Sequence, residues 1–417
     1  IPLRLVGSEM CIRDRCYGCQ ACLNICPRDA ITMREDDYGY RFPMVDLEKC
    51  IQCNLCVKVC PELNQYTLNA PRKVYAAVVK DHEILDSAAS GGFASILSRY
   101  IINDGGVVYG CSENNFEDIG HIRIANCEDL LKIRNSKYVH SDIRHTFRET
   151  KKDLDSGLKV LFTGTPCQIS GLLSFLRKPY DNLLTMDLIC HGVPPMKMLK
   201  EQVLSYSEIK GISSENIFVD FRWKEEIRSG CGSICFGLRT AIRSGDELKV
   251  IRKENDITNS YMRCFQTGIS LRENCLNCPY ARKERVSDLT AADFWGLGRY
   301  IPSDLFDLNG VSLVLINTNA GENAFNKIQD YFDIQRHSLE EAKLYNRCLS
   351  KPFARLNNRE RFLEIYKKHG LILAAKETDS IHKFESSKII RLARKNRISS
   401  LGASAFAKLL RILKIIS

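Results

Sequence analysis

Two runs of cysteines carry the clearest chemistry in this sequence. The first run holds Cys16, Cys19, Cys22 and Cys26. The second run, 34 positions further on (50 minus 16), holds Cys50, Cys53, Cys56 and Cys60. Each run has the spacing C-x2-C-x2-C-x3-C-P. Thiols grouped this tightly are typical of metal ligands, and the repeated spacing indicates an internal duplication.

The spacing predicts two 4Fe–4S clusters. Three cysteines at two-residue gaps wrap one cluster, while the fourth cysteine of the run points away and completes the other. One cluster is therefore assigned to Cys16, Cys19, Cys22 and Cys60. The other is assigned to Cys50, Cys53, Cys56 and Cys26. Zinc sites use cysteine pairs separated by a longer loop, and disulfide scaffolds are usually short secreted chains, so neither alternative suits this pattern. The predicted role is electron transfer.

Several short motifs follow the second run, in the order SAASGGFAS, SKYVHSD, TGTPCQ, DLICHG and CLNCPYARKERVSDLTAADFWG. Together with the cysteine module they resemble the beta subunit family of coenzyme F420 hydrogenase/dehydrogenase, from Cys16 to about Ile334. The resemblance implies an iron–sulfur flavoprotein that passes electrons between clusters, FAD and a small-molecule substrate. It also implies a redox partner protein, either a ferredoxin or a dehydrogenase subunit. Many bacterial members occur beside polysaccharide-synthesis genes, which points to that context without naming a substrate.

Two strand–turn–helix junctions are the candidate flavin contacts. At the first junction, SAASGG, two glycines open a helix, where free backbone N–H groups and the helix dipole favour an anion. An ordinary helix cap with a tight turn is the alternative. The predicted cofactor-binding residues are Ser87, Ser90, Gly91 and Gly92 at this junction, with Gly164 and Thr165 at the TGTPCQ junction. No G-x-G-x-x-G fingerprint occurs in the sequence, which argues against a standard Rossmann nicotinamide site.

Four further cysteines, Cys167, Cys190, Cys275 and Cys278, are candidates for a third 4Fe–4S cluster, as in relatives that carry one in this domain. Cys167 follows a proline at an expected helix start, where the helix dipole is expected to lower the pKa of the thiol. The alternatives are zinc at the C-x2-C pair and buried structural thiols at the other two positions. Cys264 is a further candidate that could replace one of these ligands. Structural roles are expected for Cys111, Cys127, Cys231, Cys235 and Cys348.

Single polar residues complete the candidate site. His191 is the predicted catalytic acid/base, because histidine titrates near neutrality, although a lone histidine after a strand is often structural. Lys137 is predicted to face a flavin or an anionic substrate, with a solvated loop as the alternative. Residues 293–296 are expected to form a packed turn under the cofactor. A charge network beside the C-x2-C pair is expected from Arg282, Arg285 and Asp288.

The elements that must position these residues follow from apolar periodicity. We expect an α+β ferredoxin-like two-cluster module, then an α/β flavin-binding body with a mixed sheet, then a helical C-terminal tail. Buried strands are predicted where short apolar runs occur, at residues 74–79, 107–111, 159–164, 183–189 and 311–316. The alternation of these runs with helical segments favours at least partly parallel pairing. Residues 235–253 predict a β-hairpin.

The expected divisions of the chain follow the same changes in pattern. Residues 1–15 resemble a translated sequencing adapter and are left out of fold reasoning. The other divisions are the 2×4Fe–4S ferredoxin domain at 16–68, an N-terminal α/β region of the body at 74–155, its C-terminal catalytic region at 156–340, and a helical region with a basic amphipathic tail at 341–417.

Composition limits the partners and the compartment. The net charge is +10, and residues 383–417 supply +8 of it, from nine Lys or Arg against one Glu. No extended basic surface is therefore expected on the body, which argues against nucleic acid. The tail is predicted either to contact an anionic membrane surface peripherally or to be a solvated helix. No membrane span or signal peptide is recognised, so a cytoplasmic location is expected.

Three functions remain open from sequence. The first is a flavin-dependent oxidoreductase. The second is a non-catalytic electron-transfer subunit of a larger dehydrogenase or hydrogenase complex. The third keeps the clusters as structural elements of a binding or repair protein.

Overall fold

The computed structural model describes residues 15–64, 66–227, 231–245, 247–305, 307 and 309–378. Three features considered from the sequence lie outside the described part. They are the side chain of Cys231, the adapter-like segment apart from its last residue, and the basic tail beyond residue 378. The chain forms two compact units, residues 1–356 and 357–417.

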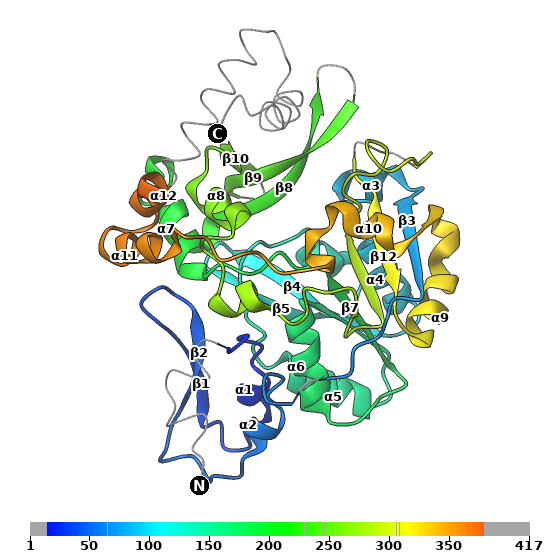
Figure 1. Cartoon of the computed structure of the whole chain (residues 1–417), viewed down its shortest axis with the longest axis horizontal. Helices are drawn as coiled ribbons and strands as arrows, with labels where there is room; N and C mark the ends of the chain where they lie inside the picture. The colour runs from blue at the N-terminus through cyan, green and yellow to red at the C-terminus, as the bar shows by residue number, and fades with distance from the viewer. Residues whose placement is uncertain are drawn as a thin grey trace. The chain divides into compact units, whose positions relative to one another are not determined.

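The N-terminal module contains a small hairpin and two short helices (Figure 1). Strands β1 (Ile31–Glu35) and β2 (Arg41–Val45) pair antiparallel. Helices α1 (Ala21–Ile25) and α2 (Leu55–Lys58) each begin one residue before the third cysteine of a run. The predicted two-cluster module is thus present as an α+β unit.

The backbone of the module repeats with the same offset as the cysteines. Gly18 and Gln52 both have positive φ (70° and 55°), and so do Gln20 and Asn54 (62° and 58°). Both pairs lie 34 residues apart, as do the first residues of α1 and α2. These four residues lie in the left-handed region at matching positions, so the backbone makes the same turn in both cysteine runs. The duplication seen in sequence is therefore also a duplication of backbone conformation.

An eight-stranded mixed sheet forms the body, in the order β13-β3-β12-β11-β7-β6-β4-β5. Its four central strands, β11, β7, β6 and β4, are parallel, and the outer pairings are antiparallel. The strands are β3 (Lys73–Val79), β4 (Val107–Asn115), β5 (Asp118–Ile124), β6 (Val160–Gly164), β7 (Leu183–Leu188), β11 (Leu289–Asp293), β12 (Ser312–Ile316) and β13 (Phe332–His337). All five predicted strands are confirmed, together with the mixed sheet. Strands from both expected body regions, 74–155 and 156–340, interleave in this one sheet.

Helices cover both faces of the sheet. Alternate residues of β6 show why: Leu161 packs with α4 (Phe93–Asn103) and α9 (Asn319–Ile328), whereas Val160 and Phe162 pack with α5 (Thr146–Asp155) and α6 (Pro166–Leu176). This period of two places successive side chains on opposite faces. The α5–α6 face also contacts the N-terminal module, because residues of the first cysteine run belong to the same apolar cluster.

A second sheet of three antiparallel strands has the order β10-β9-β8. It consists of β8 (Ile217–Ile227), β9 (Cys231–Ser244) and β10 (Glu247–Asn255), and the β9–β10 pairing confirms the predicted hairpin. The remaining helices of the first unit are α3 (His82–Ser87), α7 (Met196–Leu204), α8 (Ser260–Thr267) and α10 (Leu339–Tyr345). The second unit contains α11 (Arg359–His369) and α12 (Leu371–Thr378). Within the described ranges, no helix is long and apolar enough to cross a membrane.

Candidate iron–sulfur and cofactor site

The first cysteine group lines a small cavity in the module. Cys16, Cys19, Cys22 and Cys60 all border it, as does the left-handed residue Gln20. Burial raises the pKa of the Cys19 thiol, and proximity to the other three thiols raises it further. Four thiols that crowd one buried space are costly as free groups but suit a cluster, because the iron takes up their negative charge. The set is the one assigned from spacing.

The second cysteine group has the same composition but a more open setting. The pKa of Cys56 is raised by burial first and then by proximity to Cys53 and Cys26. Cys26 comes from the first run, as the crossed assignment predicts. Cys50 occupies the position equivalent to Cys16 in the backbone repeat. Cys53 is exposed to solvent, which places this group at the surface.

A third cysteine group forms in the body from three separate segments. Cys167 lies in the first turn of α6, Cys190 follows β7, and Cys275 and Cys278 lie in and just after a 3-10 turn (Glu273–Asn277). Burial raises the pKa of the Cys190 thiol, and proximity to Cys275, Cys167 and Cys278 raises it further. The fold thus brings together four cysteines that lie up to about a hundred residues apart in the sequence.

Glycine permits the close approach of these segments. Gly192 has φ 118°, and a Cβ there would lie 2.7 Å from the Leu271 side chain and 3.2 Å from the Cβ of Cys275. Its N–H also donates to the Cys190 Sγ at 3.3 Å. The N–H of Gly18 makes the equivalent bond to Cys16 Sγ at 3.4 Å. Backbone N–H donors to thiolate sulfur are among the protein's means of tuning a cluster.

The environment of Cys167 corrects one sequence expectation. Helix α6 does begin at Pro166, yet the pKa of the Cys167 thiol is raised to about 11, with burial as the main cause. Desolvation outweighs the hydrogen bond from Thr165 and the helix N-terminus. The position at a helix start therefore does not make this thiol a ready thiolate.

Whether the C-x2-C pair suits zinc depends on which other ligands lie near it. In the part of the chain that the structure describes, no three His, Cys, Asp or Glu side chains converge on a position for a single metal ion. The Cys190 thiol has Cys275, Cys278 and Cys167 as near neighbours, so the C-x2-C pair has two further thiols close by. Four cysteines are the ligand set that a 4Fe–4S cluster uses.

Aromatic packing joins the first and third cysteine groups. The ring of Tyr280 is close to Cys19 as well as to Cys167 and Cys278. It meets Tyr17 edge to face at a centroid distance of 5.6 Å, and its hydroxyl donates to Ser170 Oγ at 2.8 Å. The module and the body are therefore in direct contact at this point.

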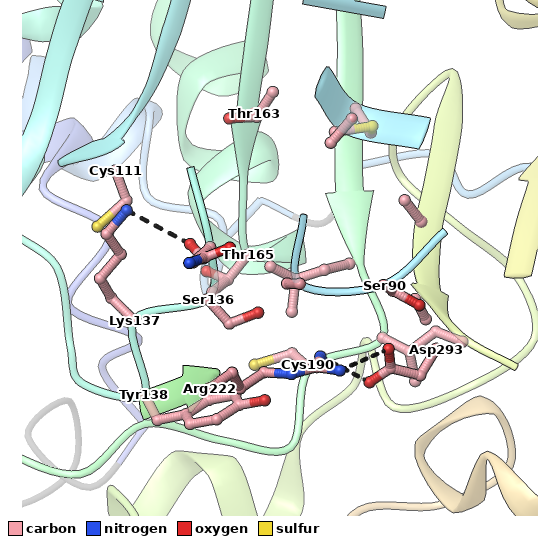
Figure 2. A pocket seen from close by; sticks show the side chains of 18 of the residues that line it. Ser90, Cys111, Ser136, Lys137, Tyr138, Thr163, Thr165, Cys190, Arg222 and Asp293 are labelled. Atoms are coloured by element: carbon pink, nitrogen blue, oxygen red, sulfur yellow. Dashed lines mark hydrogen bonds and ion pairs between the residues drawn. The ribbon is translucent and has the colours of Figure 1, made fainter. Parts of the chain in front are cut away.

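A cavity of about 760 Å³ opens at the carboxyl ends of the parallel strands. Residues at or just after the ends of β6, β7 and β11 line it, including Gly164, Leu188 and Asp293, and Cys111 of β4 does so as well. Figure 2 shows Ser90, Lys137, Thr165 and Cys190 around this space. Open α/β sheets bind their ligands at this edge. The volume lies within the range of cofactor and small-molecule sites.

The cavity receives most of the predicted cofactor-binding residues. Those that line it are Ser90, Gly92, Lys137, Gly164 and Thr165. Ser87 does not, because it ends α3 and its hydroxyl donates to the Glu83 carbonyl at 2.7 Å. Gly91 does not either, because it packs on β3, where a Cβ would lie 2.2 Å from the Ala77 carbonyl oxygen. These two residues shape the turn rather than the cavity wall.

The N-terminus of α4 is the best candidate for a phosphate contact. Phe93, Ala94 and Ser95 form its first turn and line the cavity, and Gly92 at the cap position has no side chain that could cap their N–H groups. The N–H groups of a first turn lack intrahelical partners and carry the positive end of the helix dipole. The buried Ser90 Oγ, which also has no hydrogen-bond partner, lies beside them. An anionic ligand such as the FAD pyrophosphate fits both observations.

Lys137 and His191 are both buried and both hydrogen-bond to backbone carbonyls. Lys137 donates to the carbonyl oxygens of Arg134 and Asn135, and burial lowers its pKa. His191 packs between Phe265 and Phe353, at centroid distances of 4.5 and 4.0 Å, and its Nε2 lies 3.0 Å from the Phe265 carbonyl oxygen. Burial lowers the pKa of His191 to about 4. The imidazole is therefore neutral at pH 7, with Nε2 committed to a carbonyl.

The expected charge network beside the C-x2-C pair is wrong in its pairing. Arg285 is buried and makes its ion pair with Asp187 at 3.0 Å. Asp288 accepts from the Thr185 N–H and hydroxyl at 2.8 and 2.7 Å, and exposed Arg282 pairs with Glu284. The three residues come from one loop but point to different partners, which local sequence does not reveal.

The cavity wall also contains residues that sequence reasoning missed. Arg222 of β8, Asp187 of β7, and Phe236, Phe265 and Phe353 all line it. Arg222 comes from the three-stranded sheet and pairs with Asp293, one residue of the expected packed turn. Cys111, Cys127 and Cys348, for which purely structural roles are expected, also reach the wall. Only the strand-end position of Asp187 gave a usable signal in the sequence.

Comparisons with known proteins match two parts of the chain to described families. Residues 15–63 match the 4Fe–4S dicluster domain, and residues 157–342 match the family described as the C terminus of the coenzyme F420 hydrogenase/dehydrogenase beta subunit. No curated protein matches the chain in sequence. Among solved structures, a chain of the F420-reducing NiFe hydrogenase complex from Methanosarcina barkeri is similar, at 18% identity and a TM-score of 0.42. That match covers 77% of this chain and 93% of the other.

Proposed function

The chain joins a 4Fe–4S dicluster domain to the C-terminal domain of the coenzyme F420 hydrogenase/dehydrogenase beta subunit family, and from this premise we propose an iron–sulfur flavoprotein oxidoreductase. Electrons pass between a ferredoxin-type partner protein, the clusters, FAD and a small-molecule substrate. A polysaccharide-synthesis context is part of the proposal only through the family resemblance. The substrate itself is not specified.

The single observation that carries the proposal is the position of the third cysteine group. Cys190 belongs to this group and also lines the 760 Å³ cavity. A cluster held by Cys167, Cys190, Cys275 and Cys278 would border the space in which an organic ligand fits. A flavin, when bound, exchanges single electrons with clusters and pairs of electrons with organic substrates.

The residues of the chain then have distinct tasks. The N-terminus of α4, with Ser90 and Gly92, binds the phosphates. Gly164 and Thr165 let the ligand approach the backbone at the end of β6, and Lys137 supplies a positive charge at the opposite wall. His191, neutral and packed between two phenyl rings, keeps water away from the third cluster more readily than it transfers a proton. We therefore keep His191 as a residue of the cavity wall. The catalytic acid/base role is assigned to no other residue.

The test starts from anaerobically purified protein. Denaturation should release FAD, identified by its mobility and spectrum, and iron analysis should give about twelve iron atoms per chain if three clusters are present, or about eight if there are two. Dithionite should reduce the flavin through the clusters. The absence of any flavin from protein with full iron content would contradict the proposal and favour clusters with a structural role.

The exposed position of the second cysteine group is also compatible with one alternative function. A non-catalytic electron-transfer subunit would also present one cluster at the surface, as Cys53 indicates. Such a subunit would contain reducible flavin yet show no turnover until a dehydrogenase or hydrogenase subunit is added. Turnover by the isolated chain with reduced ferredoxin would decide for the enzyme.

A further inference from the structure

The charges on the cavity wall are unevenly neutralised. Asp187 forms an ion pair with Arg285 at 3.0 Å. Asp293 accepts from both Nη atoms of Arg222 at 2.8 and 3.0 Å (Figure 2). Glu128 also lines the cavity, and it is exposed to solvent. The two carboxylates at the strand ends therefore already have positive partners within the protein.

Two arginines of the same wall have no such partner. Arg99 of α4 and Arg134, which follows a 3-10 turn (Glu128–Ile133), both line the cavity. Within the ranges that the structure describes, neither guanidinium makes an ion pair. The pKa of Arg134 is lowered by burial first and then by the charge of Arg99, so the two groups are close enough to repel each other. Neighbouring arginines without an acid favour an anion, which they bind through several directed hydrogen bonds.

Helix α4 separates this pair from its own N-terminus. Ser95 of the first turn and Arg99 both line the cavity. Because they are four residues apart, they lie on the same face of the helix, about 6 Å from each other along its axis. The cavity therefore has two positive positions on this side, the N–H groups at the start of α4 and the arginine pair one turn further along.

The loop that presents Arg134 is held in a defined conformation. Lys137 donates from Nζ to the carbonyl oxygens of Arg134 and Asn135. Asn135 has φ 65°, and its amide group is a hydrogen-bond partner of Asp220. The buried Asn135 Oδ1 has no partner of its own among the described residues, and Asn135 lines the cavity. Buried polar atoms are rarely left unpaired, so a ligand group that donates a hydrogen bond fits beside Arg134.

The two positive positions differ in their access to solvent. At the start of α4, Phe93 is 1% exposed and the Ser90 Oγ is buried. Arg99, by contrast, is exposed, and Leu131 in the turn before Arg134 lines the cavity with 62% of its surface exposed. A cofactor that stays bound suits the enclosed position. A substrate has to enter and leave, and the open position suits it.

We propose that Arg99 and Arg134 form a subsite that binds an anionic group, a phosphate or a carboxylate, of the small-molecule substrate. This inference rests on the proposed function and narrows it, because it assigns the substrate to the class of organic anions. The flavin phosphates take the start of α4, and the arginine pair takes the anionic group of the substrate. Asn135 Oδ1 accepts from a hydroxyl or N–H group of the same substrate.

Binding of inorganic pyrophosphate tests the subsite without knowledge of the substrate. The probe is titrated calorimetrically into anaerobic, iron-loaded protein that is saturated with FAD, so that the flavin occupies the start of α4. Arg99→Gln and Arg134→Gln should each weaken pyrophosphate binding by about tenfold, because hydrogen bonds to charged groups are the strong ones. Both variants should keep the FAD affinity of the unchanged protein, measured from the fluorescence of free flavin.

Two further variants serve as controls. Arg336 of β13 is exposed and does not line the cavity, so Arg336→Gln should change neither affinity. Ser90→Ala removes the buried hydroxyl beside the start of α4 and should have the opposite pattern to the arginine variants. It should weaken FAD binding and leave the affinity of the FAD-saturated protein for pyrophosphate unchanged.

Weaker pyrophosphate binding in both arginine variants, with FAD binding and the Arg336→Gln control unchanged, supports the inference. A parallel loss of FAD affinity in the arginine variants would assign the pair to the cofactor and overturn it. So would equal pyrophosphate affinity in all variants, or no pyrophosphate binding to the unchanged protein. A protein that holds no flavin would instead contradict the proposed function, and the same titrations of the flavin-free protein would still test the arginine pair, so the two failures are distinguishable.

Discussion

The two cysteine runs have the same sequence pattern and the same backbone turn, yet the fold treats them differently. In the first run, Tyr17, Cys19 and Ala21 belong to the apolar cluster that they share with α5 and α6. In the second run, Val59 alone belongs to that cluster, and Ile51 and Cys53 are exposed, the former at 59%. Local spacing therefore determines how thiols meet a cluster, whereas tertiary packing determines whether that cluster faces the body or the solvent.

Specific contacts hold the first run against the body. Arg148 of α5 donates from Nε to the Asn24 carbonyl at 2.6 Å and from Nη2 to the Cys26 carbonyl at 2.8 Å. Arg272 donates from Nε to the Cys16 carbonyl at 2.5 Å. Gly171 of α6 leaves room for Cys19, because a Cβ there would lie 3.0 Å from its Sγ. The inward cluster thus adjoins the third cysteine group, and the outward one lies next to solvent.

The largest expected effect comes from removing one ligand of each run. Cys19→Ala should lose about four iron atoms per chain and also unfold the α5–α6 side, because the cluster fills a space inside the apolar core. Cys53→Ala should lose a similar amount of iron with little change in thermal unfolding. Iron analysis and circular dichroism melting measure both. Equal losses of stability would contradict the difference between the runs.

A buried cysteine outside the groups provides the control for that experiment. Cys264 of α8 is 3% exposed, does not border the cavity of the first group, and is not among the thiols that raise the pKa of Cys190. Cys264→Ala should keep all iron and cost only what a small core cavity costs, about 1–2 kcal/mol.

The two clusters of the module should decay at different rates, because they differ in solvent access. During exposure to air or to an iron chelator, the cluster held by Cys26, Cys50, Cys53 and Cys56 should decay several-fold faster than the inward cluster, because the shell around a site controls access to it. EPR of samples quenched at intervals and then reduced follows each signal. Loss of the fast phase in Cys53→Ala would assign it. A single phase for all module iron would argue that both clusters are equally accessible.

The success of sequence reasoning follows the same division between local and tertiary effects. The eight module cysteines and the five strands were predictable because ligand spacing and apolar runs act within a few residues. The third cysteine group drew on three segments, so the family resemblance was needed to join them. Ser87 and Gly91 were misplaced because a helix end and a close contact with β3 decide their positions. Arg222 was missed because it reaches the cavity wall from a different sheet, the three-stranded one.

Cys167 shows how tertiary burial can reverse a local expectation. A helix N-terminus lowers the pKa of a thiol, and α6 does begin there. Burial nevertheless raises the pKa of Cys167 to about 11. Without iron this thiol is therefore protonated at pH 7, and cluster assembly in the third group must release its proton.

Releasing the first run from the body should have a smaller effect than removing a ligand. Arg148→Ala leaves three backbone carbonyls, those of Leu23, Asn24 and Cys26, without their charged donor. We expect a loss of about 2 kcal/mol in the free energy of unfolding. Urea unfolding of the iron-loaded protein measures it. Lys58→Ala, which removes an exposed basic residue from α2 of the second run, should change stability by less than about 0.5 kcal/mol. A comparable cost for both would mean that the body does not hold the two runs differently.

The smallest effect is expected where the first run meets the third cysteine group. Tyr280→Phe keeps the ring that packs against Tyr17 and loses only the buried hydrogen bond to Ser170, so it should cost about 1 kcal/mol and leave iron content unchanged. Tyr180→Phe is the matched control, because its hydroxyl bonds to the exposed Asp155 and should contribute less. Tyr280→Ala removes the ring between the groups and should slow reduction of the flavin by the clusters, measured by stopped flow after dithionite addition. If Tyr280→Ala transferred electrons at the unchanged rate, the contact between these groups would serve packing alone, and the route from the inward cluster would have to lie elsewhere.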